Sequence, residues 1–143
     1  MALDDPTVKM SKSAPNELSR IDILADPAKV KKAIMKATTD SEGVIRFDIE
    51  NKPGVSNLLN IYSVLSGKSV DELVAQYEGQ GYGNFKKDLV EVTVEALKPV
   101  QERYNEIRFS GELETILKDG AERANEIAEK TMKRVRSHFG LGL

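Results

Sequence analysis

The sequence predicts an all-α protein, a helical bundle with a mobile N-terminal loop arm. Apolar residues recur every three or four positions in several segments, which is the spacing of one helix face. Helix-start and helix-stop residues bracket these segments. Residues 21–24 are a short extended stretch at best, and residues 38–52 alternate too poorly for a strand. We therefore expect a loop arm and linker over 1–25 and a helical domain over 26–143.

The first expected helix begins at Pro27, because Asp26 is a good N-cap and proline suits the first helical position. Lysines occupy its outer faces, where we expect them to be solvated. A loop follows over residues 38–52, held to the core by Ile45 or Phe47. The inward positions of the helix are Val30, Ala33, Ile34 and Ala37.

The second expected helix begins at Pro53 and ends at Gly67, a left-handed stop. Ser69 and Glu72 then form a capping box that starts a short third helix. The apolar stripe of the second helix is Val55, Leu58, Leu59, Tyr62 and Leu65. The inward residues of the third are Val70, Leu73, Val74 and Tyr77.

The longest expected helix begins at Asn84, after a tight glycine-rich linker at residues 79–83. Pro99 lies inside it and should kink it, since proline removes one helix hydrogen bond. After a break near Ser110, a short helix should end or bend at Asp119-Gly120, and the last helix should stop at Gly140. The alanines of the last helix predict close packing against the longest helix. The stripe of the longest helix is Phe85, Leu89, Val92, Ala96, Val100, Tyr104 and Ile107.

Composition bounds the function. The chain is 40% hydrophobic and 31% charged, as in an ordinary globular domain, and it contains no cysteine and one histidine. Disulfides, thiolate metal sites and histidine clusters are thereby excluded. No apolar run reaches the length of a membrane-spanning helix, and no secretion leader is recognisable, so we expect a cytoplasmic protein without a membrane partner. A net charge of −2 limits any nucleic-acid contact to a local basic patch.

The candidate functional residues lie near the start of the chain, in Lys9-Met10-Ser11-Lys12-Ser13. Prolines on both sides disfavour helix, so this segment should be a loop. Lysine offers a mobile positive charge with three donors, and serine hydroxyls bond phosphate oxygens. By residue type alone, the segment is either a polyphosphate-binding loop or a solvated basic arm.

The order of these residues is the signature loop of class I aminoacyl-tRNA synthetases, and this copy is complete. Further blocks resemble bacterial tryptophanyl-tRNA synthetases in the same order, so the resemblance covers essentially the whole chain. These blocks are Asp40-Ser41-Glu42-Gly43, Asn51–Leu59, Gly79–Gly83 and Gly120–Ala124. Nothing here corresponds to the nucleotide-binding α/β half of that family, so we expect a C-terminal piece of the enzyme that is inactive alone.

The resemblance implies ATP-dependent activation of tryptophan, followed by transfer to tRNA. It implies that Lys9, Met10, Ser11, Lys12 and Ser13 contact ATP and that Lys12 is catalytic, neutralising the departing pyrophosphate. ATP, with Mg²⁺ as its counter-ion, is the expected cofactor. No protein metal ligand is assigned, and L-tryptophan would bind only through the absent half. No general acid or base is assigned, because the carboxylate pairs lie at helix starts.

The expected macromolecular partner is the tryptophan tRNA. The family's helical domain supports the anticodon end, its complete enzyme is a homodimer, and the piece alone should be monomeric. The candidates for RNA contact are basic residues of the last helix, and the alternative is that they only face water and complement the negative end of the helix: Lys130, Lys133, Arg134 and Arg136.

Two alternatives remain open from the sequence. A tyrosyl-type synthetase shares the architecture, although the blocks at the second helix and the glycine linker argue against it. A free-standing helical binding module that carries the loop is the alternative from another class of protein.

Overall fold

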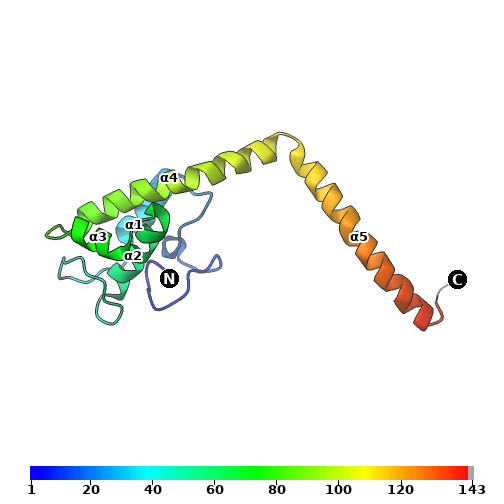
Figure 1. Cartoon of the computed structure of the whole chain (residues 1–143), viewed down its shortest axis with the longest axis horizontal. Helices are drawn as coiled ribbons and strands as arrows, with labels where there is room; N and C mark the ends of the chain where they lie inside the picture. The colour runs from blue at the N-terminus through cyan, green and yellow to red at the C-terminus, as the bar shows by residue number, and fades with distance from the viewer. Residues whose placement is uncertain (142–143) are drawn as a thin grey trace. The chain divides into compact units, whose positions relative to one another are not determined.

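A computed structural model describes residues 1–141, and throughout that range the regular structure is helical, which confirms the all-α prediction (Figure 1). A short 3-10 helix, η1, precedes five α-helices. The elements are η1 (Glu17–Ser19), α1 (Pro27–Lys36), α2 (Pro53–Ser66), α3 (Val70–Gln76), α4 (Tyr82–Phe109) and α5 (Glu112–His138). The chain forms two compact units, Met1–Gln101 and Glu102–Leu143. The expected division into a loop arm with linker, residues 1–25, and a helical domain, residues 26–143, concerns function and stays a prediction.

The first unit contains the hydrophobic core, which α1, α2, α3 and the start of α4 build together. The rings of Tyr62, Tyr77 and Phe85 meet at its centre, with centroids 5.2–6.1 Å apart. Each expected inward residue of α1 is buried, and Ile45 is the side chain that holds the 38–52 loop to the core. In α4 the predicted stripe is buried at Phe85 and Leu89 and becomes exposed by Val100.

The local signals for helix ends are confirmed. The Asp26 side chain accepts a hydrogen bond from the backbone N–H of Lys29 at 2.8 Å. Gly67 ends α2 with φ of 72°, a left-handed conformation that suits glycine. Ser69 and Glu72 form both hydrogen bonds of the capping box.

The N-terminal segment is attached more firmly than we expected. Leu3 is only 2% exposed, its N–H donates to the carbonyl of Ser19, and its carbonyl accepts from the N–H of Thr38. The Asn57 side chain donates to the carbonyls of Met1 and Ala2. The N-terminal loop arm is thus attached at its start through the buried Ala2 and Leu3, and its mobility beyond them stays a prediction. Few apolar residues precede Asn16, but Ala2 and Leu3 are placed in the core.

Thr38 connects this segment to the start of α2. Its hydroxyl donates to the carbonyl of Asp4 at 2.8 Å. A Cβ at position 54 would lie 2.2 Å from the Thr38 carbonyl oxygen, a distance that real Cβ atoms essentially never show. Gly54 is thus required because two backbones touch where α1 ends and α2 begins.

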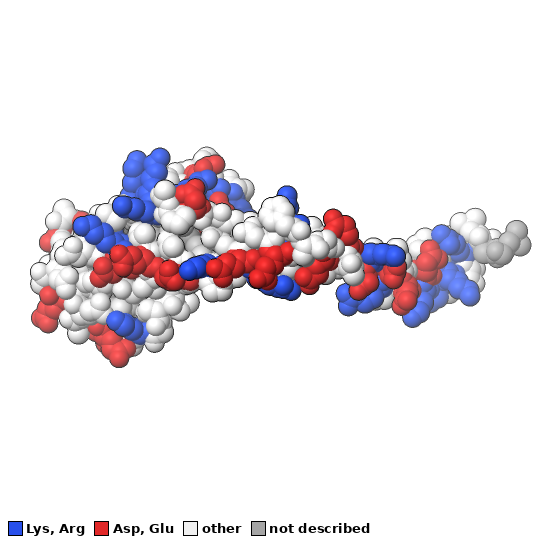
Figure 2. Space-filling model, turned by 90° about the horizontal axis from the view of Figure 1, so that it is seen from above, with Lys and Arg blue, Asp and Glu red and all other residues white. Residues whose placement is uncertain are grey.

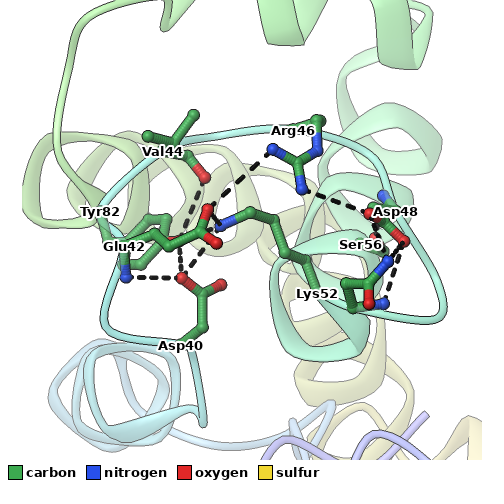
Figure 3. A network of polar contacts seen from close by, with 9 residues as sticks. Asp40, Glu42, Val44, Arg46, Asp48, Lys52, Ser56 and Tyr82 are labelled. Atoms are coloured by element: carbon green, nitrogen blue, oxygen red, sulfur yellow. Dashed lines mark hydrogen bonds and ion pairs between the residues drawn. The ribbon is translucent and has the colours of Figure 1, made fainter.

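A buried lysine secures the 38–52 loop (Figure 3). Lys52 is 1% exposed, and its ammonium group lies 2.7 Å from a carboxylate oxygen of Glu42 and 3.0 Å from Asp40. The Tyr82 hydroxyl donates to the same Asp40 oxygen at 2.6 Å and accepts from Lys52 at 3.2 Å. Burial raises the pKa of Asp40, but hydrogen bonds from Tyr82, Lys52 and the N–H of Glu42 outweigh it and lower the pKa to about 2.

Next to this lysine, Asp48 fixes the end of the loop. Its carboxylate accepts from the N–H and side chain of Asn51, and Arg46 pairs with it at 3.3 Å. The N–H of Asp48 donates to the hydroxyl of Ser56 on α2 (Figure 3). These bonds join the end of the loop to α2.

A second buried lysine caps α1. The ammonium group of Lys86 donates to the carbonyl of Ala37 at 2.7 Å, just beyond the last turn of α1. Lysine at a helix C-terminus complements the negative end of the helix dipole. Burial lowers the pKa of Lys86, so this lysine loses its proton more readily than an exposed one.

One prediction for the C-terminal helices was wrong. Asp119-Gly120 does not end a short helix, because α5 is one helix over Glu112–His138. One glycine costs a helix only about 1 kcal/mol, and good helix formers surround this one. The close packing expected from the alanines of α5 stays a prediction. α4 stays helical through Pro99.

No helix in the described part of the chain is long and apolar enough to cross a membrane.

Replacing Gly54 by alanine should lower the free energy of unfolding by about 2 kcal/mol or more, because the new methyl group meets backbone rather than a mobile side chain. Urea unfolding followed by circular dichroism measures this. Gly83→Ala is the matched control, since a Cβ there meets nothing within 4 Å and alanine favours helix. Equal loss in both variants would contradict the steric account.

The low pKa of Asp40 predicts how stability changes with pH. A carboxyl group whose pKa is lower in the folded than in the unfolded chain stabilises the fold. The full stabilisation is present at a pH above the ordinary pKa of the group, which is 3.8 for Asp40. That contribution is lost as the pH falls from about 4 to about 2. The melting temperature of wild type should therefore fall more steeply over this range than that of Asp40→Asn. Asp71→Asn, at an exposed position of α3, should keep the wild-type slope, and a wild-type slope in Asp40→Asn would refute the assignment.

Candidate functional site

The segment Lys9–Ser13 is a loop, as predicted from the flanking prolines. Its tip is a turn in which the N–H of Ala14 donates to the carbonyl of Ser11 at 3.3 Å. The hydroxyls of Ser11 and Ser13 lie 3.0 Å apart and bond to one another. Met10 is half-buried and packs against the core, while the four polar residues of the segment are exposed. The apolar residue thus fastens a loop whose polar groups face solvent.

The base of the loop is closed by side chains. Asn16 donates to a carboxylate oxygen of Asp4 at 2.7 Å, across 12 residues, and its own oxygen caps η1 by accepting from Leu18. Arg20 donates to the carbonyl of Ala14 at 3.3 Å. The segment between these contacts is therefore held at both of its ends.

A shallow hollow of about 380 Å³ lies along this loop. Lys9, Ser11 and Ser13 line it, whereas Lys12 does not. The structure thus brings three of the five predicted residues to one surface, whereas Met10 packs against the core and Lys12 is exposed outside the hollow. The remaining lining residues are Ala2, Asp4, Asp5, Val8, Ala14, Pro15, Asn16 and Ser19.

The charges of the loop are available to a ligand. Among residues 1–141, neither Lys9 nor Lys12 takes part in an ion pair. In the same hollow as Lys9, hydrogen bonds from the hydroxyl and the N–H of Thr7 lower the pKa of Asp5, which keeps this carboxylate charged. The loop can therefore bring two ammonium groups and two hydroxyls to an anion.

Sequence reasoning missed Asp4, Asp5 and Ser19 as parts of this surface. In the sequence, Asp5 before Pro6 is typical of a turn, and Ser19 carries no signal of its own. Ser19 is 2% exposed, and its hydroxyl has no partner among the described residues. Within that same part of the chain, no group of three or more His, Cys, Asp or Glu side chains could hold a metal ion.

The basic residues of the last helix lie on α5, and all of them are exposed. Figure 2 shows lysine and arginine side chains gathered toward the C-terminal end of this helix. Arg136 lies 3.8 Å from Glu129, and the Arg134 carbonyl lies 2.7 Å from a ring nitrogen of His138. Most of this basic patch, defined as Lys130, Lys133, Arg134 and Arg136, is open to a polyanion.

Comparison with known sequences identifies the chain's relatives. Residues 1–98 match the family described as tRNA synthetases class I (W and Y). A tryptophan–tRNA ligase of Bacillus subtilis is 56% identical over 142 residues, and one of Bacillus anthracis is 55% identical over 141 residues. Each alignment covers 99% of this chain but 43% of the relative, so the chain spans less than half the length of these proteins.

Solved structures agree with these relatives. A tryptophanyl-tRNA synthetase from Mycoplasma pneumoniae superposes with a TM-score of 0.77 at 34% identity, over 99% of this chain and 45% of that one. The Campylobacter jejuni enzyme, in a complex with ADP and tryptophan, gives a TM-score of 0.76 at 33% identity, over 99% of this chain and 44% of its own. With its signature loop, its helical fold and these alignments, the chain belongs to the class I tRNA synthetase family of the tryptophan and tyrosine enzymes.

Proposed function

We propose that this chain is the signature-loop and helical part of a cytoplasmic tryptophan–tRNA ligase. The observation that carries the proposal is the alignment of 99% of the chain with tryptophan–tRNA ligases at 55–56% identity. These relatives are named as tryptophan enzymes, which favours tryptophan over tyrosine as the amino acid. Their alignment with 99% of the chain also argues against a free-standing binding module.

In the proposed reaction, ATP and Mg²⁺ supply the activating phosphate chemistry, and this chain supplies positive charge and hydroxyl groups. Lys9 and Lys12 suit that role, because both are exposed and make no ion pair within residues 1–141. The hydroxyls of Ser11 and Ser13, which bond to each other, can turn to phosphate oxygens instead. The Met10 contact with the core keeps these groups close to one place.

Lys12 is the residue that we assign to catalysis. As pyrophosphate leaves, negative charge grows on its oxygens, and a positioned ammonium group lowers the energy of that state. Lys12 is exposed in the turn at the loop tip, next to Ser11 and Ser13 in sequence, so its ammonium group is open to a phosphate ligand. Such a group acts on the transition state more than on bound ATP.

The basic patch of α5 is the proposed contact with tRNA. It collects four positive side chains on a chain whose net charge is −2. Phosphate contacts of lysine and arginine are independent of sequence, so this patch would position the tRNA. Tryptophan itself would bind in the part of the enzyme that this chain does not span.

Replacing Lys12 by alanine should reduce tryptophan-dependent ATP–pyrophosphate exchange by about a hundredfold or more, with much less change in ATP affinity. The assay uses a chimera in which this chain replaces the matching part of the Bacillus subtilis ligase. Lys32→Ala, at an exposed position of α1, is the control and should keep full activity. The chain alone should give no exchange. Loss of ATP affinity in proportion to rate would contradict the role of Lys12.

Neutralising the basic patch by glutamine should weaken tRNA binding by the chimera and flatten its salt dependence. Each phosphate contact contributes a slope of about 0.7–0.9 in log affinity against log salt. Filter binding at salt concentrations from about 50 to about 200 mM measures the affinity and its salt dependence. The control neutralises the four exposed lysines of α1, Lys29, Lys31, Lys32 and Lys36. A wild-type slope in the patch variant would exclude this contact.

A further inference from the structure

Ser19, the last residue of η1, carries a buried hydroxyl group that has no hydrogen-bond partner within residues 1–141. Its backbone groups are both paired. The N–H donates to the carbonyl of Asn16 at 3.1 Å, and the carbonyl accepts from the N–H of Leu3 at 2.8 Å. Folded proteins satisfy most buried polar side chains, because a buried hydroxyl without a partner has lost its bonds to water. The unpaired hydroxyl of Ser19 therefore needs an explanation.

Neighbouring polar side chains do not supply that partner. Asn16 donates to a carboxylate oxygen of Asp4 at 2.7 Å, and Arg20 donates to the carbonyl of Ala14 at 3.3 Å. The same contacts fasten the segment on both sides of the Ser19 hydroxyl. Its position is thus fixed by bonds in which the hydroxyl itself takes no part.

Ser19 lines the hollow of about 380 Å³ beside the signature loop. Among the lining residues, only Ala2 and Ser19 are buried, so Ser19 supplies the polar group on the buried side of the hollow. The other polar lining residues are exposed. A volume of this size lies within the range of small-molecule sites, which is about 300–1,000 Å³.

The charges along the hollow indicate which part of a ligand would meet Ser19. Lys9 offers an ammonium group to phosphate oxygens. Asp4 and Asp5 line the same hollow. Asp4 follows Leu3, whose N–H is bonded to the carbonyl of Ser19, so its backbone runs beside this residue. A phosphate group next to these carboxylates would be repelled, whereas an uncharged polar group would not.

We propose that the Ser19 hydroxyl forms a hydrogen bond with an uncharged polar group in the nucleoside part of the ATP that the signature loop binds. This inference rests on the proposed function. Lys9, Ser11 and Ser13 would hold the phosphates at the exposed side of the hollow, while Ser19 positions the nucleoside at the buried side. The hydroxyl would then gain its partner when ATP binds.

Equilibrium binding measured by calorimetry tests this in the chimera with the Bacillus subtilis ligase, with ATP and inorganic pyrophosphate as separate ligands. Ser19→Ala should weaken ATP binding about two- to tenfold, as expected for the loss of one hydrogen bond between neutral groups. It should leave the affinity for pyrophosphate unchanged. Ser19→Cys, which is similar in shape but a weaker donor, should give an intermediate affinity for ATP.

Ser56→Ala is the matched control, because Ser56 is also 2% exposed but its hydroxyl accepts from the N–H of Asp48. It should lower the melting temperature of the 143-residue chain and leave ATP affinity unchanged. Ser19→Ala should instead keep the melting temperature, since no bond within the described chain is lost.

The remaining outcomes overturn the inference or separate it from the proposed function. Unchanged ATP affinity in Ser19→Ala would overturn it, and a lower melting temperature in that case would assign the hydroxyl to an ordered water. Equal weakening of ATP and pyrophosphate would place the bond on a phosphate and would also overturn it, as would a wild-type chimera that binds no ATP. Weaker ATP binding by Ser19→Ala in a chimera that catalyses no pyrophosphate exchange would support the contact and refute the proposed function.

Discussion

The backbone of Thr38 holds together the segments on which the first unit depends. Its N–H donates to Leu3, its hydroxyl donates to Asp4, and its carbonyl oxygen touches Gly54. The N-terminal segment, the end of α1 and the start of α2 therefore meet at one residue. Because only a hydrogen atom fits at position 54, the contact sets where α2 starts relative to α1. The positions of the core side chains of α1 and α2 relative to one another depend on that placement.

The same contact defines how the signature loop is presented. Leu3 and Asp4 enter the loop from the Thr38 contact, and Asn16 closes it by bonding to Asp4. Between these ends the polar residues are exposed, while the half-buried Met10 attaches the segment to the core. In the proposed function, these attachments would keep the charges of the loop close to one place while its tip closes on a ligand.

Much of the fold could be predicted because its signals are local. Asp26, Gly67 and the Ser69 capping box act within a few residues, and the stripes of α1, α2 and α3 repeat at the helix period. The buried lysines could not be predicted, since lysine is normally exposed and the partners of Lys52 and Lys86 lie 10 to 51 residues away. The continuity of α5 could not be predicted from Gly120, because a single glycine is a weak helix breaker when its neighbours favour helix. The candidate loop came from residue order, whereas Asp4, Asp5 and Ser19 joined its surface only through the fold.

The lysine that caps α1 has a consequence for how the chain acquires its structure during synthesis. The Ala37 carbonyl is bonded by Lys86, 49 residues further along the chain. The ribosome releases residues in order, so α1 emerges long before its cap exists. Until α4 arrives, those terminal carbonyls are bonded to water, and the buried side of α1 lacks the core residues Phe85 and Leu89. Completion of the first helix therefore depends on the start of the fourth, which makes folding of the first unit a late and cooperative event.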